Sequence, residues 1–143
     1  MKVRLKRQSG ASAVEFALIL PILLLLVFGI IEMGFALYDK AMITNASREG
    51  ARAGVVFKVP PVTDEEIIGV VNSYLITTLI TFSGSSSPTV NVTRSGPNSG
   101  DDLKVTVAYT YTSLILPNLI NSPVKQDFPR EFNMIAKTTM RME

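Results

Sequence analysis

The sequence predicts an α+β fold with a long N-terminal helix, a second, shorter helix and a small antiparallel sheet of about three strands. Three observations predict it: a basic N-terminus followed by a long apolar run, helical spacing of apolar residues over 64–81, and period-two alternation in the last third. At 143 residues, the chain suits one folded domain plus an anchor.

The apolar run is long enough to cross a membrane. Residues 16–31 read FALILPILLLLVFGII and contain no charged or hydrogen-bonding side chain. Residues 11–31 give 21 helical positions, a rise of about 30 Å, which matches the hydrocarbon thickness of a bilayer. Transfer of their apolar side chains favours insertion by roughly 4–8 kcal/mol. We therefore expect a transmembrane helix over residues 11–38, with a bend or hinge at Pro21.

The charge distribution sets the expected orientation. Four basic residues precede the apolar run: Lys2, Arg4, Lys6 and Arg7. A basic flank stays in the cytoplasm, so the C-terminal part is expected to be exported. The rest of the chain contains ten Lys and Arg and 12 Asp and Glu, which are mixed along the sequence and form no basic stripe. The basic N-terminus therefore indicates a membrane-topology signal, and the sequence predicts no nucleic-acid partner. The absence of Cys and His excludes disulfides, thiolate chemistry and the usual metal ligands.

The N-terminal segment is not typical of a secretory signal peptide. Its apolar stretch is too long, and no small-x-small cleavage site follows it. A plain signal anchor without processing stays an alternative, and it has the same orientation.

The first helix is expected to continue past the membrane, from about Ala11 to about Phe57, with residues 39–57 amphipathic. Ala46, Gly50 and Gly54 are spaced four apart and present small side chains on one face, where another backbone can approach closely. This face packs either on the chain's own sheet or on another subunit.

The exported domain, residues 39–143, is expected to contain four further elements. Thr63 and Glu66 form a capping-box pattern at the start of a helix over 64–81. Residues 83–88 and 113–129 are interpreted as loops. Alternating residues predict strands at about 89–94, 103–112 and 131–142, and the first two form a hairpin.

Two segments carry a family resemblance. ASAVEFALILPILLLLVFGIIEMG (11–34) and TNASREGARAG (44–54) resemble the TadE-like pseudopilins of the tight-adherence (Flp) pilus system, and KTTMRME (137–143) is similar to the usual end of that family. The resemblance is specific because the Glu15-Phe16 pair is followed, at the family distance, by a second motif. The motif residues are Asn45, Arg48, Glu49, Gly50 and Arg52.

The resemblance implies a pilin-like fold and a structural role. It implies a leader, residues 1–10, that prepilin peptidase removes by cutting between Gly10 and Ala11. It further implies a single-pass protein of the bacterial inner membrane, required for Flp pilus assembly and hence for adhesion and biofilm. The implied partners are the Flp pilin, other pseudopilins, a membrane platform and a secretion ATPase. Flp pilins are short and usually carry Glu-Tyr, so Glu-Phe with a sizeable exported domain favours a minor component.

Two carboxylates lie in the predicted membrane region. A charged side chain there is costly and indicates function. By the pilin resemblance, Glu15 is expected to meet the α-amino group created at Ala11, its own or a neighbour's; the alternative is a carboxylate that points to cytosolic water. Glu32 lies about 260° around the helix from Glu15. It is interpreted as a residue of the outer interface or as a contact with a partner subunit.

A second function class is a membrane-tethered binding module or adhesin without leader cleavage. Its candidate contacts are Leu114–Leu116, Tyr109 and Tyr111, which also suit a core or subunit interface. The sequence predicts no enzyme, cofactor or small-molecule substrate, because its acidic clusters fit a helix N-terminus (64–66) and a turn (101–102). A weak cation site at Asp101 and Asp102 is the alternative for the turn.

Overall fold

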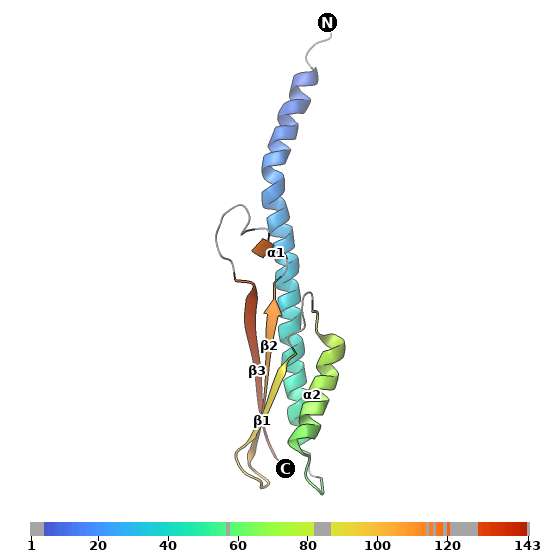
Figure 1. Ribbon diagram of the computed structural model, residues 1–143, viewed down its shortest axis with the longest axis vertical. Coiled ribbons are helices and arrows are strands. Elements are labelled where there is room, and N and C mark those ends of the chain that lie inside the picture. Colours follow the sequence, from blue (N-terminus) through green and yellow to red (C-terminus); the bar gives the residue numbers. More distant parts are fainter. Residues whose placement is uncertain are drawn as a thin grey trace.

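The computed structural model describes residues 5–56, 58–81, 87–113, 115, 117, 118, 120 and 129–142, with side chains from Gly10 onward. Its elements, in chain order, are α1 (Leu5–Gly54), α2 (Asp64–Thr78), β1 (Thr89–Arg94), β2 (Asp102–Thr112) and β3 (Glu131–Arg141). The predicted α+β class is therefore confirmed, with one long helix, one short helix and a three-stranded antiparallel sheet (Figure 1).

The long helix α1 contains 50 residues and continues through Pro21. Its N-terminal half stands clear of the other elements, and its C-terminal half packs beside the sheet and α2 (Figure 1). It begins at Leu5, before the expected Ala11, because Leu, Lys, Arg and Gln are good helix formers. It ends at Gly54, earlier than the expected Phe57.

The second helix begins with the predicted capping box. The Glu66 N–H donates to Thr63 Oγ1 at 3.3 Å, and the Thr63 N–H donates to Glu66 Oε2 at 3.0 Å. α2 ends at Thr78, before the expected Thr81, because the chain becomes extended at Leu79. The next N–H, that of Ile80, donates to Asp39 Oδ1 of α1 at 2.9 Å.

β2 is the central strand of the sheet, with β1 and β3 antiparallel on either side. Val105 illustrates the register, since it pairs with Val92 of β1 and Thr138 of β3. Every second residue of β2, starting at Leu103, is buried, and the residues between them are more exposed. The sheet therefore buries one face, as its period-two pattern predicts.

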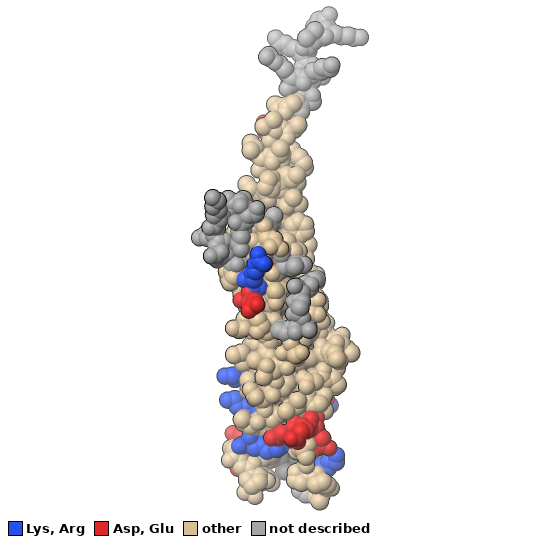
Figure 2. Space-filling model, viewed as in Figure 1, with Lys and Arg blue, Asp and Glu red and all other residues tan. Residues whose placement is uncertain are grey.

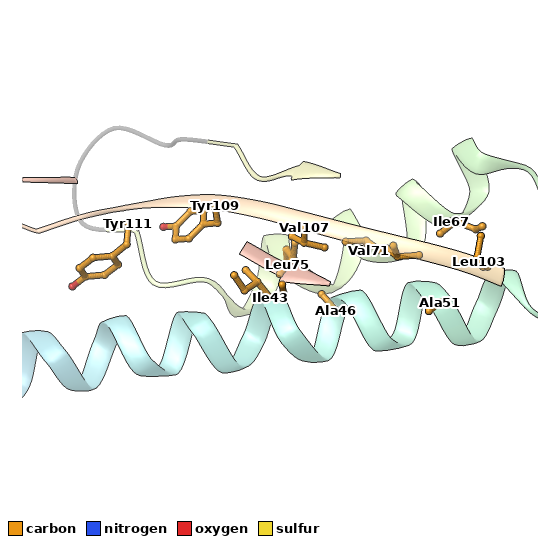
Figure 3. Close-up of a cluster of buried hydrophobic side chains, with 12 residues drawn as sticks. Ile43, Ala46, Ala51, Ile67, Val71, Leu75, Leu103, Val107, Tyr109 and Tyr111 are labelled. Carbon is orange, nitrogen blue, oxygen red and sulfur yellow. The ribbon is translucent and has the colours of Figure 1, made fainter. Parts of the chain in front are cut away.

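The core lies between that face, α1 and α2 (Figure 3). Its largest fully buried aliphatic side chains are Ile43, Ile67, Leu75, Leu103, Val71, Val105 and Val107. Burial of each such side chain stabilises the fold by about 1.5–3 kcal/mol, so each pair contributes several kcal/mol to the free energy of folding. The architecture is two layers, with both helices on the same side of the sheet.

The small-residue face of α1 packs within the chain. A Cβ at Gly50 would collide with Val71 of α2, and a Cβ at Gly54 would collide with Ile67 and with Leu103 of β2. Ala46 on the same face is fully buried. Of the two interpretations of this face, packing on the chain's own elements is therefore correct.

The two predicted loops lie mostly outside the described residues. Of 83–88, only Ser87 and Pro88 are described, and of 113–129 only six scattered positions are described.

We predict opposite effects for the same substitution at two glycines. Gly50→Ala forces Val71, a stiff β-branched side chain, to move, and overpacking of this kind costs about 1–3 kcal/mol. Gly69→Ala is the matched control, because Gly69 is exposed on α2 with open space around it, and alanine there stabilises a helix by about 0.5–1 kcal/mol. Thermal unfolding of the detergent-solubilised chain measures both. A Gly50→Ala variant as stable as Gly69→Ala would contradict the packing described.

Candidate functional site

The predicted processing and assembly residues lie together near the start of α1. Gly10, Ala11, Glu15 and Phe16 are all exposed, and Phe16 has a relative exposure of 61%. A Cβ at Gly10 would meet nothing within 4 Å. The backbone on either side of the predicted cleavage bond is therefore open to another protein.

The basic residues of the predicted leader are only partly described. Lys2 and Arg4 lie outside the described residues, and Lys6 and Arg7 lie in the first turns of α1, where the backbone alone is described.

Helical geometry brings Ala11 and Glu15 onto one face. Residues four apart are neighbours on a helix, and they are separated by a rise of about 6 Å. A helix beginning at Ala11 would also carry the positive end of its dipole beside Glu15. This arrangement holds a carboxylate within one turn of the position at which cleavage would create an amine.

The part of α1 that follows Glu15 is an exposed apolar surface. The large side chains with more than a third of their surface exposed are Val14, Phe16, Leu18, Ile19, Ile22, Leu23, Leu24, Leu25, Leu26, Val27, Ile30 and Ile31. In the view of Figure 2, charged side chains gather on the domain at the opposite end of the molecule. Among the described residues, α1 is the one helix long and apolar enough to cross a membrane.

The second family motif has an inner and an outer face. Gly50 is buried against Val71, and the buried Ser47 shares a 2.7 Å hydrogen bond with Thr138 of β3. The outer residues Asn45, Arg48 and Arg52 are exposed.

Glu49 accepts a hydrogen bond from Arg52 at 3.2 Å, as their spacing predicted. The two side chains are largely exposed, so this pair adds little stability. The inner face of the motif therefore explains the packing of α1, and the outer face is open to a partner.

Glu32 of α1 accepts hydrogen bonds from the residues that follow β2. Only 4% of its surface is exposed, and its Oε1 accepts hydrogen bonds from Ser113 Oγ at 2.7 Å and from the Ile115 N–H at 3.2 Å. The Tyr111 hydroxyl lies 3.5 Å from the Glu32 backbone oxygen. The Glu32 carboxylate, which was expected at the outer interface or in contact with a partner subunit, is therefore buried by its own chain, 81 residues away in sequence.

Asp39 is a second buried carboxylate, which the sequence reasoning missed. It is fully buried, its Oδ1 accepts the Ile80 N–H, and its Oδ2 has no hydrogen-bond partner in the described part of the chain. Its position next to Tyr38, in an amphipathic stretch, gave no sign that the end of α2 would return to it. Glu32 and Asp39 are two places where a carboxylate of α1 meets a later part of the chain.

The two tyrosines considered for an adhesin surface belong to the core. Tyr109 and Tyr111 are 5% and 2% exposed, and both lie on the buried face of β2 (Figure 3). Burial, together with the charges of Glu32 and Asp39, raises the pKa of Tyr111 to about 12. Leu114 and Leu116, the other candidates, lie outside the described residues.

The acidic clusters have local partners. Asp101 Oδ2 accepts the Asn98 N–H at 2.9 Å within a turn, and Asp64 forms an ion pair with Arg94. Within the described residues, no group of three or more His, Cys, Asp or Glu side chains is placed to hold a metal ion.

We predict that Glu32→Ala lowers the free energy of unfolding by about 2–4 kcal/mol, since it leaves a buried hydroxyl and a backbone N–H without their acceptor. Glu32→Gln keeps an acceptor oxygen and should retain most of the stability. Glu65→Ala, at an exposed position of α2, is the control and should change stability by less than about 0.5 kcal/mol. Denaturant unfolding in detergent measures the three variants, and wild-type stability of Glu32→Ala would show that this attachment is unimportant.

Comparison with known proteins places the N-terminal region in a family. Residues 10–52 match the family described as TadE-like protein. No curated protein and no solved structure matches the chain significantly. The match includes Gly10, Glu15 and most of the second motif, and it ends before α2 and the sheet. The match over this region agrees with the predicted resemblance and supports a TadE-like protein of the Tad (Flp) pilus system.

Proposed function

We propose that this chain is a membrane-anchored pseudopilin, a minor pilin-like component that prepilin peptidase processes and that Tad (Flp) pilus assembly requires. Adhesion and biofilm formation would depend on it through the pili. The observation that carries the proposal is the exposed Gly10–Phe16 segment at the start of an apolar helix, within the region that matches the TadE-like family.

The proposed division of the chain follows the residues of α1. Residues 1–10 are the leader, residues 11–38 are the span, and residues 39–143 form the exported domain. The basic leader keeps the N-terminus in the cytoplasm. The hydrogen bonds of Glu32 to Ser113 and Ile115 support an attachment of the exported domain to the last turns of the proposed span.

Glu15 is proposed to act as a registry device. A carboxylate inside a low-dielectric environment is costly when alone, and an ammonium partner offsets much of that cost. The α-amino group at Ala11 supplies the partner, either on the same helix or from the neighbouring subunit. A neighbour in the correct register satisfies both charges, whereas a shifted neighbour leaves both without a partner.

The proposed location is the bacterial inner membrane. The proposed partners are prepilin peptidase, the Flp pilin, other pseudopilins, the membrane platform and the secretion ATPase. The exposed Asn45, Arg48 and Arg52 give the exported part of α1 a polar surface for such contacts. The role is structural, and the family to which the N-terminal region belongs supports a component of the pilus system without enzymatic activity.

The alternative, a tethered binding module, differs in its processing. It needs no mature N-terminus at Ala11. The burial of Tyr109 and Tyr111 removes two of its candidate contacts, so the observations favour the pseudopilin.

The first test is the mature N-terminus. Mass spectrometry of the membrane-extracted protein should show a chain that begins at Ala11, and Gly10→Leu should leave the full-length precursor, because a side chain at this position blocks close approach to the backbone. Gly34→Leu is the matched control, since Gly34 also lies on an exposed part of α1 with open space around it. A wild-type protein that starts at Met1 in piliated cells would reject the proposal.

The second test separates membrane insertion from assembly. Glu15→Ala should insert normally, because it makes the span more apolar. Loss of one partner of a buried ion pair costs about 3–5 kcal/mol, so pilus output should fall at least about tenfold. Glu65→Ala, on the exposed face of α2, controls for the loss of a carboxylate. Normal piliation of the Glu15→Ala cells would show that the carboxylate has no role in assembly.

A further inference from the structure

An apolar groove lies between α1 and the edge strand β3. Its volume is about 390 Å³, and α1 contributes Met33, Leu37 and Lys40 to its lining. β3 contributes Phe132, Met134 and Ile135. The groove is at the end of the exported domain that faces the apolar half of α1, because Met33 follows directly on Glu32, where the domain first attaches.

The groove walls expose apolar surface outside the core. Met33, Leu37 and Ile135 have relative exposures of 58%, 63% and 51%, and Phe132 has 39%. Scattered apolar side chains are normal on a protein surface, but a contiguous set that lines a cavity marks a binding site.

The exposed apolar surface of α1 leads into this groove. Large apolar side chains are exposed from Val14 to Ile31 and again at Met33 and Leu37. From Met33 to Lys40 the helix rises about 10 Å, and the headgroup layer of a bilayer is about 5–8 Å thick on each side. Tyr38, which is 41% exposed, lies at this level, where aromatic side chains anchor membrane proteins. A span that ends in this region places the groove in the headgroup layer.

Among its described lining residues, the groove has one cationic side chain, that of Lys40. The Lys40 ammonium lies at its far end and donates to the Ile135 backbone oxygen at 2.5 Å, which leaves two of its three N–H groups for another acceptor. The other ionisable groups of the described lining are Glu32 and Tyr111, and Glu32 Oε1 already accepts hydrogen bonds from Ser113 and Ile115. The Lys40 ammonium therefore lies at the end of the groove that is farther from the apolar half of α1.

We propose that this groove binds one anionic phospholipid of the outer face of the membrane. Its acyl chain lies along Met33, Leu37 and Ile135, and its phosphate accepts hydrogen bonds from Lys40. This arrangement suits the two ends of a phospholipid. The headgroup lies at Lys40, away from the bilayer interior, and the acyl chain extends from there toward the bilayer. The inference rests on the proposed membrane anchoring and orientation, and it adds a ligand that pseudopilin function does not itself require.

The test uses the full chain in nanodiscs of phosphatidylcholine that contain a phosphatidylglycerol probe with a photoactivatable group in its acyl chain. Mass spectrometry maps the adducts after irradiation. We expect adducts on residues 33–37 and 132–135, in addition to those on the span. Lys40→Gln should lower the groove adducts about fivefold, the effect of one ammonium at an anionic lipid surface. Lys40→Arg should restore them, and Lys58→Gln, at an exposed position near the opposite end of the domain, should leave them unchanged.

Three outcomes would overturn the proposal. Adducts confined to residues 14–31 would show ordinary boundary lipid. Equal labelling by a phosphatidylcholine probe, unaffected by Lys40→Gln, would show a groove without headgroup recognition. Absence of adducts from residues 33–37 with either probe in nanodiscs that hold two chains, and their appearance in nanodiscs that hold one chain, would assign the groove to a second copy. Carbonate extraction of the same samples reports membrane insertion separately, so a failure of anchoring is distinguishable from a failure of lipid binding.

Discussion

The exposed apolar surface of α1 is the constraint on which the rest of the structure depends. Its large side chains from Val14 to Ile31 are uncovered by the described parts of the chain, and each removed from water contributes about 1.5–3 kcal/mol. Such a surface requires a membrane or the helices of other subunits. The domain formed by α2 and the sheet leaves it free because it packs on the C-terminal half of the same helix.

The attachment of the domain uses two different kinds of contact. Near the end of α1, close packing at Gly50 and Gly54 excludes water and brings α2 and β2 against the helix backbone. Nearer the apolar half of α1, Glu32 and Asp39 accept hydrogen bonds from the chain beyond β2 and beyond α2. These contacts extend over more than 20 residues of α1, from Glu32 to Gly54, so the domain is attached along the C-terminal half of the helix.

The carboxylates of α1 show how position decides their roles. Glu32 and Asp39 are buried by the chain that follows them, so they are structural and their contacts are satisfied within the subunit, apart from one oxygen of Asp39. Glu15 is exposed on an apolar helix and sits one turn from the predicted new amine. The fold thus leaves Glu15 exposed, which agrees with its proposed role in assembly.

Local sequence patterns were enough to predict the class of the fold, which the structure confirms, and they are the basis of the candidate site. Three of the patterns are local: the apolar run, the capping box at Thr63 and the alternation along β2. Each can be recognised from the spacing of residues within one helix or strand. The segment Gly10–Phe16 was predicted as a processing site from its own residues, because such a site is a linear motif. Only the tertiary structure decided which neighbour fills each face. The partners of Glu32, Asp39 and Gly50 are 81, 41 and 21 residues away, and no local pattern encodes which parts of the chain meet across such distances. Those contacts depend on how the whole domain packs against the helix, which is a property of the folded chain.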